Sequence, residues 1–320
     1  MSQRPLLSVV MPTYRQQDLL AGALDSLAAQ ELPHATAEIV VVDDGTPDFT
    51  PDDVDLATSP HPVRWICLPE NGGRSRARNH GIRAAAGEII VFLDGDMATA
   101  PGFLAAHADF HRAHPGEVAV GAIRFGPWVP RNAMTRYIHS RGVQGHRPGD
   151  TVPYKCFVTG NSSVARRQLE EVGLFDEGLS HYGGEDLELG LRLHRAGVRF
   201  RFAAEARALH GHARPFREQL CAMETYGRTG IPHLVARHPE LATVLQVDVL
   251  HRRTPRALAL RLTLSSAVYR PVRWLTSGLL WAPLPGILFS YLWWCSRTRG
   301  YRAATRAATT SAAATGAPGA

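Results

Sequence analysis

The sequence predicts an α/β fold in which helices flank a doubly wound sheet. Over the first hundred residues, short apolar runs typical of strands alternate with segments in which apolar residues recur at helical spacing. The run 89–93 is apolar at every position, which is typical of a central strand buried on both faces. Polar residues follow three of these runs, and sheets of this kind bind ligands at the carboxyl ends of their strands. The sequence therefore predicts one ligand site at this edge.

The predicted elements follow in a regular order. Strands are expected at 6–10, 38–42, 63–68, 89–93, 118–125 and 198–209, with a further strand-like segment at 157–165. Helices are expected at 19–30, 74–86, 101–114, 131–141 and 187–196, followed by a helical extension from 215 to 238. Gly87 ends the second helix. The stretch 142–152 is rich in Gly and Pro and is expected to be a loop.

The helix expected at 101–114 carries His107, His111 and His114. Spacings of four and three residues place the three side chains on one helical face. A zinc site is one interpretation, but no glutamate completes a metallopeptidase helix motif at this point. We therefore expect these histidines to form the solvated face of an amphipathic helix.

Asp94 and Asp96 follow directly after the central apolar run. Two carboxylates so close together repel each other unless positive charge lies between them, and a divalent cation supplies it. Carboxylate ligands suit Mg²⁺ or Mn²⁺, whose coordination phosphate oxygens would complete. An isolated Asp-x-Asp is more often a solvated turn, so this interpretation depends on the other motifs.

Three further motifs add polar groups to the expected site. Gly160 and Asn161 lie in a run of small residues that would let a ligand approach the backbone closely. Glu185 and Asp186 open a helix after two glycines, and capping and the helix dipole explain one acid there better than two. The segment His210-Gly211-His212 ends the last predicted strand.

The basic excess is confined to the C-terminal part of the chain. The formal charge is +6, but 251–320 holds ten arginines and no acidic residue, so 1–250 carries a charge of about −4. A nucleic-acid-binding protein would spread basic residues over a folded face with stacking aromatic residues, so we expect no nucleic-acid partner. Arginines gathered around an apolar segment instead predict binding to anionic lipid.

Several classes of protein are disfavoured. The four cysteines form no Cys-x-x-Cys pair, which argues against a zinc ribbon or a disulfide framework and is compatible with a reducing compartment. No secretory signal is apparent at the N-terminus. The first predicted strand is followed neither by the Gly-x-Gly-x-x-Gly of a dinucleotide oxidoreductase nor by the Gly-rich, Lys-bearing phosphate loop of a nucleotidyltransferase.

The segment 256–302 has the composition of a membrane-associated region. Arginines alternate with apolar residues up to Trp274, and 276–296 then contains no charge and is long enough for one crossing. Pro283 and Pro285 interrupt this stretch, and arginines flank it on both sides. The positive-inside rule therefore favours a re-entrant hairpin or an interfacial helix over a single span. A buried helix pair packed on the preceding domain is the third alternative. The residues 303–320 are expected to be disordered.

The ordered set of motifs resembles the family 2 glycosyltransferases, which are nucleotide-diphospho-sugar enzymes of the GT-A fold. The resemblance extends from Leu7 to His212 and rests on SVVMPTY, VVDDG, NGGRSRARNHG, FLDGD, TGNSSVARRQLEEVGLFDE and GGEDLELGLRLHRAG, followed by a late histidine. The GGED helix is also similar to the equivalent segment of galactosyl- and N-acetylgalactosaminyltransferases. The Arg-rich run 74–78 departs from the family, which often has fewer basic residues there.

The resemblance implies a role for each matching residue. Asp186 would be the catalytic base, and Glu185 would hold hydroxyls of the acceptor or donor. Asp96 would bind the metal, Asp94 would contact the ribose or the metal's shell, and His210 would be the late metal ligand, although His212 is close enough to replace it. The residues expected to bind the nucleotide sugar are Pro12, Thr13, Tyr14, Asp44, Arg74, Arg78, Asp94, Gly160 and Asn161.

The resemblance also implies a fold, a reaction and partners. We expect a GT-A catalytic domain with a mixed sheet at 1–214, a helical extension at 215–255, membrane-associated helices at 256–302 and a tail at 303–320. The expected reaction is inverting transfer from a nucleotide sugar, with a UDP-sugar as donor and Mn²⁺ or Mg²⁺ as cofactor. The expected acceptor, a lipid-linked or cell-envelope glycan, follows from the C-terminal segment alone and not from the resemblance. We expect the protein at the cytoplasmic face of the membrane. A sugar-nucleotide-binding or membrane scaffold protein without catalysis is the alternative function.

Overall fold

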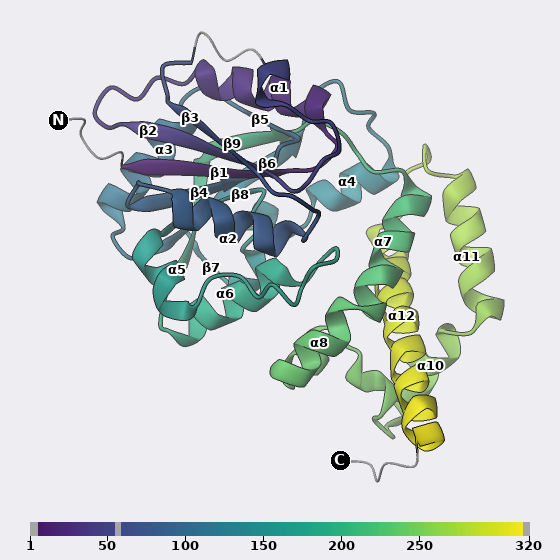
Figure 1. Cartoon of the computed structure of the whole chain (residues 1–320). Coiled ribbons are helices and arrows are strands. Elements are labelled where there is room, and N and C mark those ends of the chain that lie inside the picture. The colour runs from purple at the N-terminus through teal and green to yellow at the C-terminus, as the bar shows by residue number, and fades with distance from the viewer. Residues whose placement is uncertain (1–5, 55–58, 316–320) are drawn as a thin grey trace. The chain divides into compact units, whose positions relative to one another are not determined.

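The computed structural model describes residues 6–54 and 59–315, and the chain divides into two compact units (Figure 1). The sheet unit comprises Met1–Pro130, His139–Ser180 and Glu185–Ala213. The helical unit comprises Arg131–Ile138, His181–Gly184 and Arg214–Ala320. Each unit has a hydrophobic core of its own and is described separately.

A mixed sheet of nine strands forms the centre of the sheet unit among the described residues. The strand order is β3-β2-β1-β4-β8-β6-β9-β5, and β7 pairs with β9. The strands β1 to β4 run parallel to one another, whereas β8 is antiparallel to both β4 and β6. The bounds are β1 Leu7–Thr13, β2 Ala37–Asp43, β3 Val63–Cys67, β4 Ile89–Leu93, β5 Met97–Thr99, β6 Val118–Phe125, β7 Thr151–Val152, β8 Asn161–Ala165 and β9 Phe200–His210. The expected mixed α/β sheet is thus confirmed.

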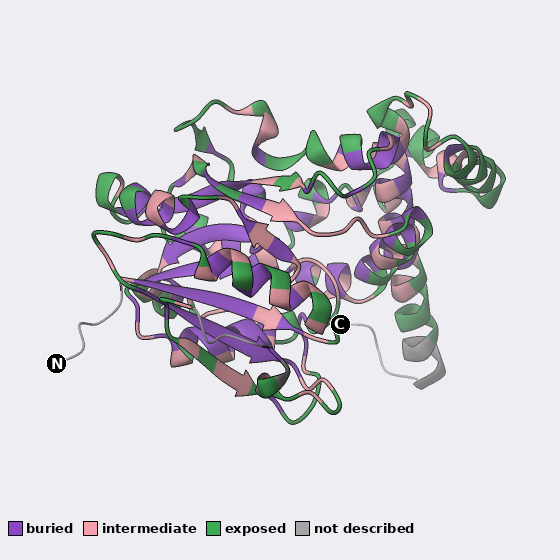
Figure 2. Ribbon diagram, turned by 90° about the horizontal axis from the view of Figure 1, so that it is seen from above, coloured by how far each residue is buried: buried purple, intermediate pink, exposed green. Residues whose placement is uncertain are grey.

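Helices cover both faces of this sheet, and the strands between them are largely buried (Figure 2). Side chains alternate along β1, so that Val9 packs in the core beneath α1 and α3 and Val10 packs on the other side, near α2. The helices α5 and α6 contribute Leu169 and Leu189 to that second core. The bounds are α1 Gln17–Ala28, α2 Arg74–Ala84, α3 Phe103–Ala113, α5 Arg166–Val172 and α6 Glu185–Arg195.

The expected solvated histidine face on α3 is wrong for two of its three members. His107 and His111 are buried, because this face of α3 packs on the sheet. His107 Nδ1 and His111 Nε2 each lie 2.8 Å from the hydroxyl of Ser163 in β8. These contacts give the buried ring nitrogens a hydrogen-bond partner, which buried polar groups need. Burial lowers the pKa of His107 to about 3 and that of His111 to about 4. Both imidazoles are therefore neutral parts of the core.

The helical unit is built around α7 Phe216–Arg228 and α12 Gly286–Thr315. The two helices cross at Gly227 and Gly300, where an added Cβ would lie 1.9 Å from the carbonyl oxygen of Arg297 and 2.1 Å from that of Glu224. Glycine at both positions therefore lets the backbones approach closely. The remaining helices are α4 Ala133–His139, α8 Gly230–Arg237, α9 Leu241–Val244, α10 Pro255–Thr263 and α11 Ser266–Gly278.

The secondary structure of the C-terminal residues agrees with the prediction in one respect and differs from it in another. The helix α11 ends at Gly278 and α12 begins at Gly286, so Pro283 and Pro285 interrupt the apolar stretch as predicted. The expected disorder from 303 is wrong as far as Thr315, because α12 continues to that residue. Alanine is frequent in 303–315 and has the highest helix propensity, so the packed helix extends into it. The remaining tail, 316–320, lies outside the described residues. Among the helices of the described part, none combines the length and apolarity needed to cross a membrane.

Candidate active site

The carboxyl end of β4 carries Asp94 and Asp96, and the short strand β5 that follows brings the end of β9 beside them. β5 pairs antiparallel with β9, with Met97 opposite His210. The N–H of Gly211 donates a hydrogen bond of 2.7 Å to the carbonyl oxygen of Asp96. A Cβ at position 211 would lie 2.8 Å from that oxygen, so a glycine is needed for this contact. Two segments more than a hundred residues apart in sequence are thus fixed together.

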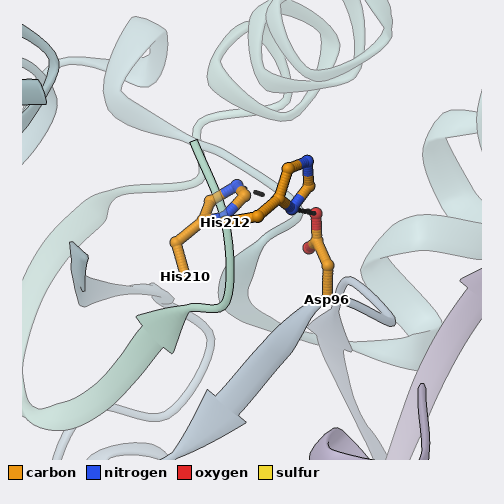
Figure 3. Close-up of side chains that lie close together, drawn as sticks. All are labelled: Asp96, His210 and His212. Carbon is orange, nitrogen blue, oxygen red and sulfur yellow. Dashed lines mark ion pairs between the residues drawn. The ribbon is translucent and has the colours of Figure 1, made fainter. Parts of the chain in front are cut away.

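The result is a cluster of one carboxylate and two imidazoles, shown in Figure 3. His212 Nδ1 lies 3.3 Å and His210 Nε2 lies 3.8 Å from Oδ2 of Asp96. The other carboxylate oxygen, Oδ1, is buried and accepts no hydrogen bond from the described residues. Burial raises the pKa of Asp96, although the two histidines act in the opposite direction.

This donor set fits a divalent cation. One potential ligand atom from each residue lies within 4.8 Å of the others, and the unsatisfied oxygen of Asp96 is available to a ligand. Carboxylate and imidazole together suit Mn²⁺ better than Mg²⁺, which prefers oxygen ligands. Both His210 and His212 lie in the cluster, so either histidine or both could bind a metal ion there.

Asp94 makes a different contact. Arg78, from α2, is buried with only 1% of its side chain exposed, and its Nη2 lies 2.8 Å from Oδ1 of Asp94. Its Nη1 lies 3.5 Å from Oε1 of Glu185 at the start of α6. Burial alone would raise the pKa of Asp94, but Arg78 and then Arg74 lower it below its ordinary value. Arg78 therefore bridges Asp94 and Glu185, two acidic residues predicted for the site. Asp94 itself does not belong to the cluster of Asp96, His210 and His212.

Asp186, in the first turn of α6, is held by one residue that the sequence did not single out. Thr159 donates from its hydroxyl to Oδ1 of Asp186 at 2.8 Å and from its N–H to Oδ2 at 3.3 Å. Burial, and then the charge of Glu185, raise the pKa of Asp186 to about 7, and Arg78 opposes them. A carboxylate with this pKa suits general-base catalysis at neutral pH. The only signal for Thr159 was its place in the run of small polar residues before β8.

The residues expected to contact the nucleotide lie at the ends of β1 and β2. The carboxylate of Asp44 accepts hydrogen bonds from the N–H groups of Gly72 at 2.9 Å and Gly73 at 2.8 Å. The N–H of Asp44 donates to the carbonyl oxygen of Thr13 at 2.9 Å. Asp44 thereby holds the loop before α2 against the end of β1, and its contact with a base or ribose remains a prediction.

Pro12 and Tyr14 are partly exposed beside the buried Thr13, and the guanidinium of Arg15 lies 5.1 Å from the centre of the Tyr14 ring. Arg74 is exposed at the start of α2 and is close enough to Asp94 and Asp96 to affect the pKa of each. These side chains line the same carboxyl edge as the acidic residues.

Gly160 and Asn161 have different surroundings. A Cβ at Gly160 would lie 2.9 Å from Cε of Met97 and 3.6 Å from Oδ2 of Asp94, so this backbone is next to the site. Asn161 is fully buried, and its amide nitrogen donates to the carbonyl oxygens of Ala122 and Ala206. Its amide oxygen lies 3.1 Å from His107 Nε2. The Asn161 side chain is thus bonded within the sheet.

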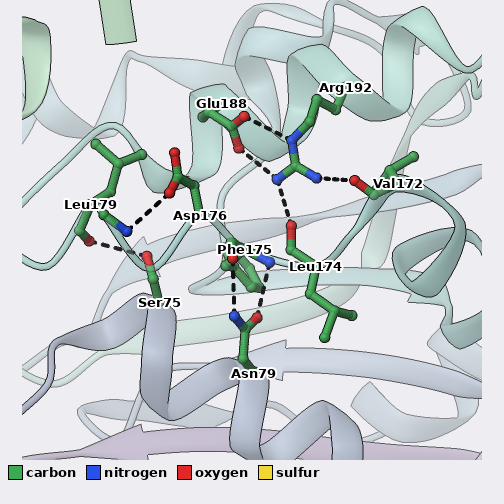
Figure 4. Close-up of polar contacts among 10 residues, drawn as sticks. Ser75, Asn79, Val172, Leu174, Phe175, Asp176, Leu179, Glu188 and Arg192 are labelled. Atoms are coloured by element: carbon green, nitrogen blue, oxygen red, sulfur yellow. Dashed lines mark hydrogen bonds and ion pairs between the residues drawn. The ribbon is translucent and has the colours of Figure 1, made fainter. Parts of the chain in front are cut away.

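A polar network behind the site fixes the segment that precedes α6 (Figure 4). Asn79 of α2 exchanges two hydrogen bonds with the backbone of Phe175, and Ser75 donates to the carbonyl oxygen of Leu179. Arg192, held by the buried Glu188, donates to the carbonyl oxygens of Val172 and Leu174. The same helix that carries Arg78 thus also anchors this segment.

Comparison with known proteins identifies the group to which these features belong. The model of glycosyl transferase family 2 matches residues 8–172, and a model of the N-terminal domain of galactosyltransferase matches 143–214. Validoxylamine A glucosyltransferase of Streptomyces hygroscopicus subsp. limoneus is 29% identical over 282 residues, which cover 78% of this chain and 61% of that protein. A second relative, the uncharacterized glycosyltransferase YfnE of Bacillus subtilis, is covered to 64%, so the chain spans less than two thirds of the length of either relative.

Two solved structures share the fold at low sequence identity. TarS 1-349 of S. aureus, in complex with UDP, has a TM-score of 0.56 at 18% identity, and the match covers 95% of this chain and 91% of that one. The mannosyltransferase PcManGT of Pyrobaculum calidifontis, in complex with GDP-Man and Mn²⁺, has a TM-score of 0.56 at 20% identity, over 94% and 88%. Since the family model alone covers more than half of the residues, the chain belongs to glycosyl transferase family 2.

Proposed function

We propose that the protein is a metal-dependent, inverting glycosyltransferase that moves a sugar from a nucleoside diphosphate to an acceptor hydroxyl. The observation that carries this proposal is the pairing of two sites at one sheet edge. One is the cation cluster of Asp96, His210 and His212, and the other is Asp186 with a pKa raised to about 7. The first suits a diphosphate leaving group and the second suits an attacking hydroxyl.

The first turn of α6 supplies the two acidic residues that would act on the acceptor. Asp186 takes the proton from the attacking hydroxyl, and Thr159 fixes the orientation of its carboxylate. Glu185 is ion-paired with Arg78, which keeps it in place to accept hydrogen bonds from sugar hydroxyls and reduces its reactivity as a nucleophile. One free base without a competing nucleophile supports a single displacement, which inverts the anomeric carbon.

Residues of β4, β9 and the start of α2 would bind the diphosphate of the donor. A divalent cation held by Asp96, His210 and His212 would neutralise the charge that develops on the leaving diphosphate. Arg74 is exposed near the same carboxylates and supplies a second positive group for the diphosphate. The ends of β1 and β2, joined through Asp44, form the expected side for the nucleotide.

The proposed partners follow from the relatives and the charge distribution. A UDP-sugar is the proposed donor, because TarS was solved with UDP and another structure of it with UDP-GlcNAc. Mn²⁺ is the proposed cofactor, which the mannosyltransferase complex also contains. A lipid-linked or cell-envelope acceptor at the cytoplasmic face of the membrane is proposed from the arginine-rich C-terminal segment.

A panel of UDP- and GDP-sugars tests the proposal. Thermal stabilisation and release of nucleoside diphosphate are measured for each sugar with MnCl₂, with MgCl₂ and with EDTA. At least one UDP-sugar is expected to stabilise the protein with Mn²⁺ and to be hydrolysed slowly. If no sugar nucleotide raises the unfolding temperature with either metal, the proposed function is wrong. If one binds equally well in EDTA, the metal dependence is wrong.

A further inference from the structure

Large apolar side chains are exposed on one part of the helical unit. Among the described residues, nine of the eleven large hydrophobic side chains that are exposed lie between 258 and 287. We call them the apolar face: Leu258, Leu260, Leu262, Val268, Trp274, Leu275, Leu279, Trp281 and Ile287. Exposed apolar residues scattered singly need no explanation, but a concentration of this kind marks an interaction site.

The orientation of α11 leaves its apolar residues Val268, Trp274 and Leu275 outside the core of the unit. The helix packs inward through Tyr269 and Thr276, which are buried. The hydroxyl of Tyr269 lies 2.8 Å from that of Ser296 in α12, and the guanidinium of Arg299 lies 4.9 Å from the Tyr269 ring centre. Trp274, on the same helix, remains 77% exposed. The side of α11 that faces the unit is therefore packed and hydrogen-bonded, while Trp274, its largest apolar residue, points away from the core.

The charged residues of α10 and α11 are all arginines. Arg256, Arg270 and Arg273 are exposed on α10 and α11, and no acidic residue occurs anywhere from 251 to 320. Pairing this face with a second copy of itself would bring two such arginine sets together, which repulsion disfavours. An anionic surface complements the arginines, and the aromatic Trp274 and Trp281 are the residue type enriched at membrane–water interfaces.

A cavity of about 560 Å³ adjoins this face. The exposed side chains of Leu260 and Ile287 line it, as do Arg256 and Trp294. Arg252 and Asp248 also line it and form an ion pair of 2.7 Å with each other. An apolar wall next to the guanidinium group of Arg256 matches the two parts of a phospholipid, an acyl chain and an anionic headgroup.

We propose that α10, α11 and the segment joining α11 to α12 dock on the surface of an anionic lipid bilayer, with the apolar face inserted at the level of the headgroups. The helix α11 has 13 residues and contains Pro271, so it lies along the interface rather than across the membrane. Arg270 and Arg273 contact lipid phosphates at the rim. Docking requires neither donor nor acceptor and is therefore separate from the proposed catalytic function.

Sedimentation of the full chain with vesicles tests this surface. Vesicles of phosphatidylcholine alone are compared with vesicles that also contain phosphatidylglycerol, at low salt and at about 0.5 M salt, where charges are strongly screened. Binding to the anionic vesicles is expected, and salt should weaken it. The tryptophan fluorescence of the unmodified chain is expected to be quenched by lipids brominated near the headgroup, which shows that at least one tryptophan side chain reaches that level of the bilayer.

Two double variants examine the two components of the face. Trp274→Glu with Trp281→Glu should lower the partition coefficient at least tenfold, because both side chains leave the interface. Val244→Glu, an exposed apolar residue outside the face, is the matched control and should bind as the parent does.

Arg270→Glu with Arg273→Glu should also lower binding to anionic vesicles at least tenfold. Arg167→Glu, on the exposed side of α5, is its control.

The outcomes that overturn the proposal are distinct. Equal sedimentation of the chain with both kinds of vesicle at both salt concentrations would contradict the proposed attraction between the arginines and anionic lipid. Sedimentation with neither kind of vesicle would contradict membrane docking altogether. Unchanged binding by the tryptophan variant would show that another surface makes the contact. A dimer of the parent chain that dissociates in the tryptophan variant would make the apolar face a protein interface instead.

Discussion

Arg78 Nη2 lies 2.8 Å from Oδ1 of Asp94, and the guanidinium is almost completely removed from solvent. A charge buried in this way is tolerated because it has Asp94 on one side and Glu185 on the other. The contact joins α2 to the end of β4, so one side chain couples the packing of a helix to the arrangement of the acidic site.

Replacing Arg78 with methionine should destabilise the protein by about 3 kcal/mol or more, because two acidic groups would lose their buried cation. Chemical denaturation measures the loss. Arg83→Met is the matched control on the same helix: this side chain is 56% exposed and its ion pair with Glu177 is 3.5 Å long. A surface pair of that kind contributes about 1 kcal/mol at most. Equal effects of the two substitutions would contradict the bridging role of Arg78.

Asp96→Ala should weaken Mn²⁺-dependent donor binding at least tenfold, since even residues outside the immediate metal ligands typically contribute that much. Isothermal titration with the donor identified by the panel, in Mn²⁺ and in EDTA, gives the affinities. Asp109→Ala, an exposed acid on α3, is the control and should bind as the parent does. Full metal-dependent affinity in the Asp96 variant would show that the cluster is not the cation site.

Asp186→Asn should leave donor affinity unchanged and lower kcat by about 10²–10⁴-fold, the range of general-base contributions. The folded-state pKa of Asp186 is raised from 3.8 to about 7, so the protein loses stability as the pH rises between these values, and the loss is complete at pH 8. The Asn variant should therefore unfold at a temperature no lower than the parent at pH 8, which separates catalysis from folding. A fall in kcat of less than tenfold would make Glu185 the next candidate for the base.

The pH dependence of transfer should report the Asp186 carboxyl. With a pKa of about 7, the rate should rise with pH through neutrality and level off above it, because only the ionised form accepts a proton. Thr159→Val removes a hydrogen bond that lowers this pKa, so its rising limb should move to higher pH. Thr159→Ser keeps the hydroxyl and should restore the parent profile. An unshifted limb in the valine variant would rule out this positioning role.

Acid should destabilise the sheet unit through its buried histidines. His107 is neutral in the folded state with a pKa of about 3, whereas the unfolded chain takes up a proton near pH 6.5. Stability is therefore fully present above about pH 6.5 and falls as the pH is lowered towards 4. His107→Gln should be less stable at pH 7 but should show a flatter decline between these values. His34→Gln, at an exposed position, should keep the parent slope.

The central strand and the acidic residues beyond it could be predicted because both depend on local patterns. An unbroken apolar run such as 89–93 has few structural alternatives, and the residues after it must lie at the sheet edge. The pairing of β5 with β9 could not be predicted in this way. β5 has only three residues, and it is the contact between Asp96 and Gly211 that brings both histidines to the carboxylate.

Most of the remaining differences between the predicted and the observed structure involve buried polar residues. Helical spacing shows that His107 and His111 share a face, but not whether the opposing strand offers a hydroxyl such as that of Ser163. Asn161 was expected to contact a ligand because it lies in a run of small polar residues. Its side-chain amide is instead hydrogen-bonded to the carbonyl oxygens of Ala122 and Ala206 and lies beside His107. Such partners come from segments distant in sequence, so local patterns do not reveal them.

The glycine crossing of α7 and α12 has a consequence for where the chain can be cut or fused. Phe216 and Leu220 of α7 share a core with Phe289 and Leu292 of α12, so the last long helix completes the first one of its unit. A shortened expression fragment that stops before 286 would leave the α7 surface bare and prone to aggregation. Fusion partners and affinity tags should therefore be placed after Thr315, and the roles of α10 and α11 are best separated by point substitutions in an intact chain.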